Sequence, residues 1–187
     1  LRDRVGAAHE TTIVANARRL GAVLASHDDT TSDQVAVSAG QGVHFAEFPT
    51  TFEAAAACQA HGVAVMMGGP NLIRGGSHSG NVAAKELAEA GLLDILSSDY
   101  VPSSLLSGAL FLGDLWGDVA RGVATVTRAP AKATGLADRG ALRPGLRGAP
   151  VEDVQGLHIR VREAVLMHPH QGAEKLAHAV GITLGPT

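Results

Sequence analysis

A fourfold alternation of short apolar runs and helical stretches constrains the fold more than any other feature of this sequence. The apolar runs are partly β-branched and introduced by a glycine or a Gly-Leu pair, which are strand signals, and they cover residues 21–27, 42–47, 62–68 and 92–99. The helical stretches each precede a glycine, a favourable C-terminal cap, and cover residues 7–20, 31–39, 51–61 and 82–90. Such alternation implies right-handed βαβ crossovers, so the sequence predicts an α/β fold with parallel strands.

Polar residues gather where the predicted strands end, at residues 27–29, at Glu47, at residues 71–81 and at Asp99. Catalytic groups occupy this edge both in (β/α) barrels and in doubly wound sheets, so the clustering alone leaves both folds open. No G-x-G-x-x-G fingerprint follows a predicted strand, which weakens the dinucleotide-binding alternative.

Three of these residues could bind a metal ion. His27 ends a strand, where a neutral imidazole is a good ligand, although the residue taken alone fits a hydrogen-bonded strand-end histidine better. Asp99 could ligate a metal and take a proton from an attacking water, or it could cap the next helix. Glu47 could face the apolar interior, where a carboxylate needs a metal or a cation, or it could lie in solvent.

The most informative stretch is the glycine-rich segment 68–81. Its glycines allow backbone amides to turn toward an anion, and a following helix would add partial positive charge. Arg74 offers a bidentate fork for phosphate, and His78 could donate to a phosphoryl oxygen or protonate a leaving group. The alternative is a flexible surface loop, but a bare linker has little need for an arginine, a histidine and two serines so close together. The expected binding residues are Arg74, Gly75, Gly76, Ser77, Ser79 and Asn81.

Composition excludes several classes of function. The formal net charge of −3 gives no case for binding nucleic acid or an anionic membrane. No apolar run approaches the roughly 20 residues of a membrane span, and no signal peptide is visible, so we expect a cytoplasmic protein. The single cysteine, Cys58, excludes an internal disulfide and a cysteine-cluster metal site.

Five segments together resemble, in order, the motifs of the phosphonate-pathway diphosphatases, a branch of the amidohydrolase superfamily. The resemblance extends from about residue 20 to residue 147. The segments are Ala-Ser-His-Asp-Asp-Thr-Thr at 25–31, Ala-Glu-Phe-Pro-Thr-Thr at 46–51, Met-Gly-Gly-Pro-Asn at 67–71, Arg-Gly-Gly-Ser-His-Ser-Gly-Asn at 74–81 and Asp-Ile-Leu-Ser-Ser-Asp-Tyr-Val-Pro at 94–102.

The resemblance implies the C-terminal half of a metal-dependent hydrolase (β/α)₈ TIM barrel, with strands five to eight in residues 1–113. Residues 114–147 would add a C-terminal helix and the start of a small β segment; the sequence itself indicates helices at 103–112 and 115–128 and a turn-rich, possibly β, stretch at 138–145. Residues 148–187 diverge from the family, and we hypothesise a frameshift or a gene end near Arg147.

The implied reaction is hydrolysis of ribose 1-methylphosphonate 5-triphosphate to the 5-phosphate and pyrophosphate. His27, Glu47 and Asp99 would hold a divalent metal, zinc in the first place, with manganese or iron as alternatives; Asp99 and His78 would be catalytic. The alternatives are a related amidase or deaminase and a non-catalytic phosphate-binding remnant, because one scaffold hosts many functions.

The family's metal-binding motifs on the first and fourth barrel strands are absent from this sequence. We therefore expect the intact parent to be an enzyme and this chain alone to lack a complete metal site. Barrel strands five and eight would both be exposed edges, which are prone to pairing. We expect a homo-oligomer or a complex with an N-terminal half barrel.

Overall fold

The structure is a computed structural model that describes residues 2–77 and 79–147 of the chain. The predicted tail at 148–187 and the residue His78 lie outside the described residues. Four parallel strands form one sheet in the order β1-β2-β3-β4, so the α/β class and the parallel sheet are confirmed. The strands are β1 (Leu24–His27), β2 (Val43–Glu47), β3 (Ala64–Gly68) and β4 (Ile95–Ser97).

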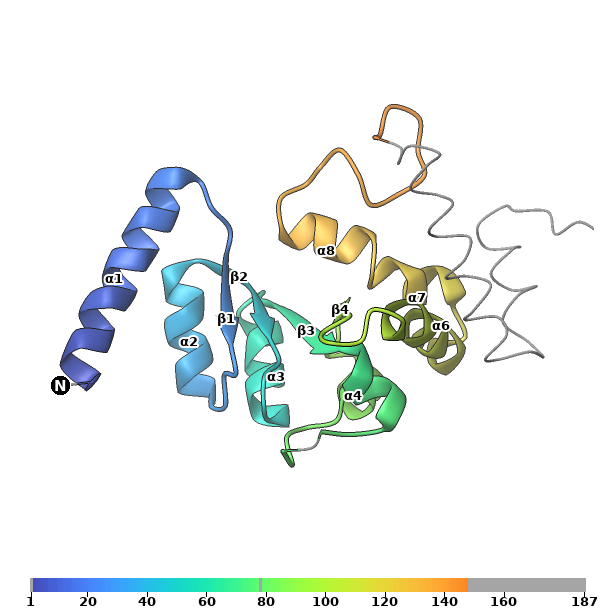
Figure 1. Ribbon diagram of the computed structural model, residues 1–187, viewed down its shortest axis with the longest axis horizontal. Coiled ribbons are helices and arrows are strands. Elements are labelled where there is room, and N and C mark those ends of the chain that lie inside the picture. The colour runs from blue at the N-terminus through green and yellow to red at the C-terminus, as the bar shows by residue number, and fades with distance from the viewer. Residues whose placement is uncertain (1, 78, 148–187) are drawn as a thin grey trace, which may run out of the picture.

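Helices connect the strands in the predicted alternation (Figure 1). α1 (Arg2–Leu20) precedes β1, α2 (Ser32–Gln41) and α3 (Phe52–Ala60) follow β1 and β2, and α4 (Gly69–Arg74) and α5 (Ala84–Glu89) lie between β3 and β4. Local capping explains two of the starts. Thr31 accepts a hydrogen bond from the Gln34 amide in a full capping box, and Thr51 accepts one from the Ala54 amide.

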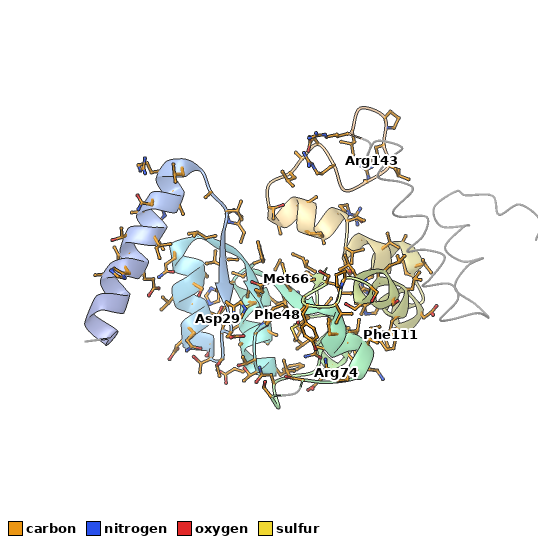
Figure 2. All side chains as sticks on the ribbon, viewed as in Figure 1. Asp29, Phe48, Met66, Arg74, Phe111 and Arg143 are labelled. Atoms are coloured by element: carbon orange, nitrogen blue, oxygen red, sulfur yellow. The ribbon has the colours of Figure 1, made fainter. Side chains whose placement is uncertain are left out.

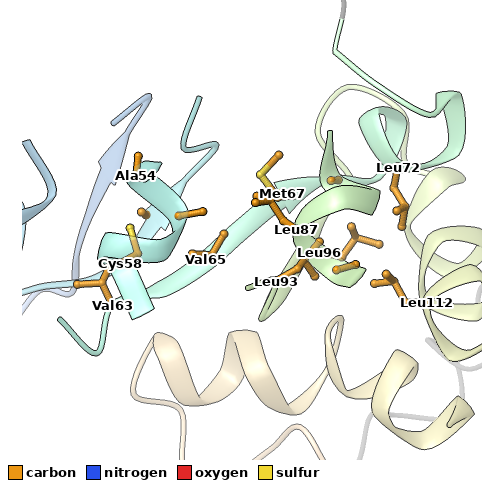
Figure 3. Close-up of a cluster of buried hydrophobic side chains, with 14 of the residues drawn as sticks. Ala54, Cys58, Val63, Val65, Met67, Leu72, Leu87, Leu93, Leu96 and Leu112 are labelled. Carbon is orange, nitrogen blue, oxygen red and sulfur yellow. The ribbon is translucent and has the colours of Figure 1, made fainter. Parts of the chain in front are cut away.

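One face of the sheet packs against the helices and forms the core (Figure 3). Val65 and Met67 of β3 lie on this face, and helices contribute Cys58, Leu87 and Leu112, all of them buried. Full burial of such side chains stabilises the fold by roughly 1.5–3 kcal/mol each. The core therefore holds the strands in place from the helical side.

The other face of the sheet is less covered. The register places His27 beside Glu47 and Glu47 beside Met66, so these side chains share this face. His27 is exposed, whereas Glu47 and Met66 are half-buried. Residues on this face near the carboxyl ends of the strands are thus accessible to ligands or partners.

The C-terminal helices differ from the prediction. α6 (Ser104–Trp116) runs on past residue 112 and ends at left-handed Gly117, after which Asp118 caps α7 (Val119–Ala124). α8 (Arg128–Ala133) follows, so the single helix expected at 115–128 is wrong. Residues 138–145 form turns and bends where a β segment was considered possible. Of the helices in the described part of the chain, none combines the length and apolar character that a bilayer crossing requires.

Candidate functional site

A cleft of about 230 Å³ opens where the carboxyl ends of the strands meet the glycine-rich segment. Asp28 and Phe48 follow β1 and β2, and Asp99 follows β4; all three line the cleft. Arg74, the last residue of α4, lines it from another side, and Figure 2 labels both Phe48 and Arg74. The predicted concentration of polar groups at this edge is therefore present as a cleft.

The backbone is strained at three points of this rim. Asp28, Phe48 and Asp99 have φ angles of 60°, 57° and 49°, in the left-handed region that non-glycine residues seldom adopt. Such residues cost of the order of 1–3 kcal/mol each and cluster at functional sites. In the described ranges these are all the non-glycine residues with positive φ, and each lines the cleft.

Asp99 lies against the glycine at the end of β3. A Cβ atom placed on Gly68 would lie 3.2 Å from Asp99 Oδ2 and 3.6 Å from Phe48 Cε1. The Asp99 amide donates to Ser97 Oγ over 3.1 Å, which holds the turn after β4. The helix-cap alternative for Asp99 is wrong, because Ser103 occupies the N-cap position of α6.

The first half of the glycine-rich segment is helical. It contains α4, which ends at left-handed Gly75, and residues 82 and 83 separate the segment from α5. The helix predicted after the segment is present but begins at Ala84 instead of residue 82, and at six residues it is too short to contribute a strong dipole at its N-terminus.

Asn71 closes this segment, and the sequence interpretation gave it no role. Its Oδ1 accepts from the Ala84 amide over 2.9 Å, and its Nδ2 donates to the Val82 carbonyl over 3.4 Å. Its own carbonyl accepts from the Gly76 amide over 3.0 Å. One side chain thus holds the two ends of the segment together. An asparagine just after a strand and a Gly-Gly-Pro turn is the signal that could have identified it.

Most of the expected phosphate-binding residues line the cleft. They are Arg74, Gly76, Ser77, Ser79 and Asn81. Gly75 does not line it and instead ends α4. The Ser79 amide donates to Ser77 Oγ over 3.1 Å, and Arg74 Nη2 donates to the Tyr100 hydroxyl. Tyr100 and Asp28 also line the cleft, although the sequence interpretation assigned no role to either.

His27 and Glu47 lie beside the cleft without lining it. The His27 Nδ1 atom lies 3.0 Å from Asp28 Oδ2, and both side chains are more than half exposed. The His27 ring meets Phe48 edge-on, with centroids 5.5 Å apart. Asp28 and Phe48 therefore connect His27 to the cleft. His27 thus ends β1 as predicted, with its ring in contact with a neighbouring carboxylate.

The metal-binding potential of the described residues is partial. Among residues 2–77 and 79–147, no group of three or more His, Cys, Asp or Glu side chains could hold an ion. Two features nevertheless suit a ligand set: His27 and Glu47 are register neighbours, and the Asp28 contact at Nδ1 leaves Nε2 of His27 free for a ligand bond. Any complete site would need further donors.

Cys58 takes no part in the cleft. It lies fully buried on α3, and its burial, together with the nearby Asp29 and Asp94 carboxylates, raises the pKa of the thiol to about 11. A thiol of this kind stays protonated at neutral pH, so its position fits a packing role and not that of a nucleophile.

Comparisons with known proteins agree with the resemblance seen in the sequence. No family profile matches the chain. Over 139 residues it is 53% identical to the alpha-D-ribose 1-methylphosphonate 5-triphosphate diphosphatase of Escherichia coli K12, a match that covers 73% of this chain. The chain spans 37% of the length of that relative. The resemblance to a phosphonate-pathway diphosphatase is therefore confirmed as a sequence similarity over this part of the relative.

A solved structure supports the fold. The crystal structure of an uncharacterized protein aligns with a TM-score of 0.55 at 19% identity, covering 79% of this chain and 44% of that one. At this identity the similarity concerns the fold alone. It is consistent with a four-stranded part of a larger barrel-like α/β protein.

Proposed function

We propose that this chain, as a relative of the phosphonate-pathway diphosphatases, is the C-terminal part of a hydrolase that acts on a phosphoric anhydride. The substrate would be ribose 1-methylphosphonate 5-triphosphate, cleaved in the cytoplasm to the 5-phosphate and pyrophosphate. The observation that carries the proposal is the cleft itself, which Arg74, Ser77 and Ser79 line together with Asp28 and Asp99. Cationic and hydroxyl donors suit phosphoryl oxygens, and a carboxylate suits a water that must lose a proton.

Each residue has a role in the proposed reaction. Arg74, Ser77, Ser79, Asn81 and the Gly76 amide bind the phosphoryl oxygens and stabilise charge as it develops on them. The oxygen of water bonds to the α-phosphorus, the bond from that phosphorus to the oxygen of the leaving pyrophosphate breaks, and Asp99 takes the proton. His78, outside the described residues, would donate to a phosphoryl oxygen or protonate the leaving group.

The proposal includes a divalent metal ion, zinc in the first place, with manganese or iron as alternatives. The resemblance assigns His27, Glu47 and Asp99 to it, but the described residues do not bring three such side chains into one ligand group. His27 and Glu47, as register neighbours, would supply a pair of donors, and the further donors would come from outside the described residues. Asp28 would orient the His27 ring through Nδ1, as outer carboxylates do for metal-ligating histidines. Such an ion lowers the pKa of bound water and stabilises charge on phosphoryl oxygens.

The proposal also includes a partner that completes the sheet. We place β1 to β4 as strands five to eight of a (β/α)₈ barrel, which needs eight strands to close. Either a second copy of this chain or an N-terminal half barrel would supply the others. In the described part of the chain β1 pairs only with β2, so its other edge is open.

Release of pyrophosphate tests the proposed reaction. The chain is incubated with ribose 1-methylphosphonate 5-triphosphate and zinc, manganese or iron, both alone and together with the remaining part of the E. coli relative. We expect metal-dependent release in the mixture, at least 100-fold slower in Asp99→Asn, in line with the loss of a general base. Asp33→Asn, an exposed carboxylate on α2, is the matched control. In a parallel incubation with cyclic amides, hydrolysis of the amide without pyrophosphate release from the triphosphate would favour an amidase or deaminase.

A non-catalytic phosphate-binding protein is the second candidate. The absence of a three-ligand group among residues 2–77 and 79–147 favours it. Metal analysis of the purified chain separates the two: binding of pyrophosphate without bound zinc, manganese or iron, in every mixture, would support the non-catalytic function.

A further inference from the structure

Tyr100 occupies a position that packing does not explain. Its side chain is 64% exposed, so burial of the ring contributes little to holding it there. It follows the strained residue Asp99 and lines the same cleft. Its hydroxyl accepts a hydrogen bond from Arg74 Nη2, which is the contact that accounts for its placement.

This contact joins two separate parts of the rim. Arg74 ends α4, on the segment after β3, whereas Tyr100 belongs to the turn after β4. Arg74 is itself exposed, and a long exposed side chain loses considerable rotamer freedom when it must meet an anion in one geometry. A fixed acceptor at the rim removes part of that cost before any ligand arrives.

The chemistry of the pair leaves capacity for an anion. A guanidinium has five N–H donors, and the contact with Tyr100 uses a donor on Nη2 only. The phenolic oxygen accepts in this contact, so its own proton is free to point elsewhere. Because Nη2 carries one N–H on each bidentate edge, the contact occupies one edge of the guanidinium and leaves the other available for phosphate.

We propose that Tyr100 is a positioning residue that holds the Arg74 guanidinium ready for a polyphosphate, an inference that rests on the proposed function. Tyr100 affects phosphate binding only by orienting the Arg74 side chain. Tyr100 therefore sets the affinity of the cleft for the phosphate chain, whatever group carries that chain.

Calorimetric titration of the full chain with inorganic tripolyphosphate tests this in four proteins: the wild type, Tyr100→Phe, Arg74→Ala and the double variant. We expect Tyr100→Phe to bind about 5-fold more weakly, as loss of one hydrogen bond implies, and Arg74→Ala to bind more weakly still. The double variant should bind no more weakly than Arg74→Ala, because Tyr100 has nothing left to position. Phe52→Leu, an exposed aromatic on α3, is the control and should bind like the wild type.

The single tyrosine of the chain adds a direct readout. Tripolyphosphate should perturb its near-ultraviolet absorption in the wild type, and Arg74→Ala should abolish that change. Equal affinity of Tyr100→Phe and the wild type would overturn the inference alone, and so would additive losses in the double variant. A wild type that binds no tripolyphosphate would overturn the proposed phosphate site and the inference with it.

Discussion

Asp99 and Gly68 approach each other so closely that a methyl group on Gly68 would lie 3.2 Å from Asp99 Oδ2. Gly68 has an ordinary extended backbone, with φ −79°, so the need for glycine comes from the space that Asp99 and Phe48 occupy. The end of β3 thus determines where the carboxylate after β4 can lie.

Gly68→Ala should therefore reduce activity more than stability. The added methyl group displaces the Asp99 carboxylate by a few tenths of an ångström, and such misplacement lowers kcat/KM by roughly 3- to 10-fold. Pyrophosphate release and thermal unfolding measure the two effects. Gly40→Ala is the control, because a Cβ at Gly40 meets nothing within 4 Å; it should leave activity unchanged. A Gly68→Ala protein of full activity would show that the close approach has no catalytic consequence.

Asn71→Ala should loosen the glycine-rich segment. It removes the hydrogen bonds to residues 82 and 84, and each such bond contributes about 1 kcal/mol. We expect faster proteolysis within residues 75–81 and weaker binding of tripolyphosphate. Asn71→Asp is the matched variant, because it keeps the acceptor for the Ala84 amide and loses the donor to Val82. If the protease cleaves Asn71→Ala at the wild-type rate, the Asn71 side chain does not hold the two ends of the segment together.

Gly122→Ala should destabilise the packing of α6 against α7. A Cβ atom at Gly122 would lie 2.2 Å from the Ala109 carbonyl oxygen and 2.5 Å from the Gly113 amide, both backbone atoms that cannot move alone. We expect the free energy of unfolding in urea to fall by about 3 kcal/mol, as overpacking implies. Gly6→Ala, whose Cβ would meet nothing within 4 Å, should not destabilise the protein. Equal urea midpoints of unfolding for Gly122→Ala and Gly6→Ala would contradict the close packing of Gly122 against α6.

Cys58 should make stability depend on alkaline pH. The thiol has its pKa raised from 9.0 to about 11 in the folded state, so folding favours the protonated form. Its contribution is complete below pH 9 and is lost as the pH rises through 11, because the unfolded chain then releases a proton that the folded chain retains. Urea unfolding at several pH values measures the slope, which Cys58→Ala should reduce. A thiol reagent that modifies the native protein as fast as the unfolded one would contradict the burial.

The open edge of β1 should make the isolated chain self-associate or capture a partner. An unpaired strand edge offers backbone donors and acceptors to another chain. Analytical ultracentrifugation should show dimers, larger species, or a complex when the N-terminal part of the relative is added. A monodisperse monomer that forms no complex with the N-terminal part of the relative would be evidence against the proposed completion of the barrel.

Much of the fold could be predicted from local pattern. The runs that end at His27, Glu47 and Gly68 became parallel strands, and the stretches that open at Thr31 and Thr51 became capped helices. These features depend on residues near one another in sequence. The predicted helix at 115–128 failed because Gly117 and Asp118 end one helix and begin another, a break that apolar spacing hides.

The candidate site, too, has features that local sequence predicts and features that it does not. Residue type and the alternation of strand and helix are local properties, so the sequence was enough to predict that Arg74, Ser77 and Asp99 lie at the ends of the strands. Which of these groups meet depends on how the strands and turns pack in three dimensions. The tertiary structure set Arg74 against Tyr100, Gly68 against Asp99 and Asn71 across its own segment, and it left His27 beside the cleft. Such contacts join residues from different strands and turns, so they follow from packing and register, which no local pattern encodes.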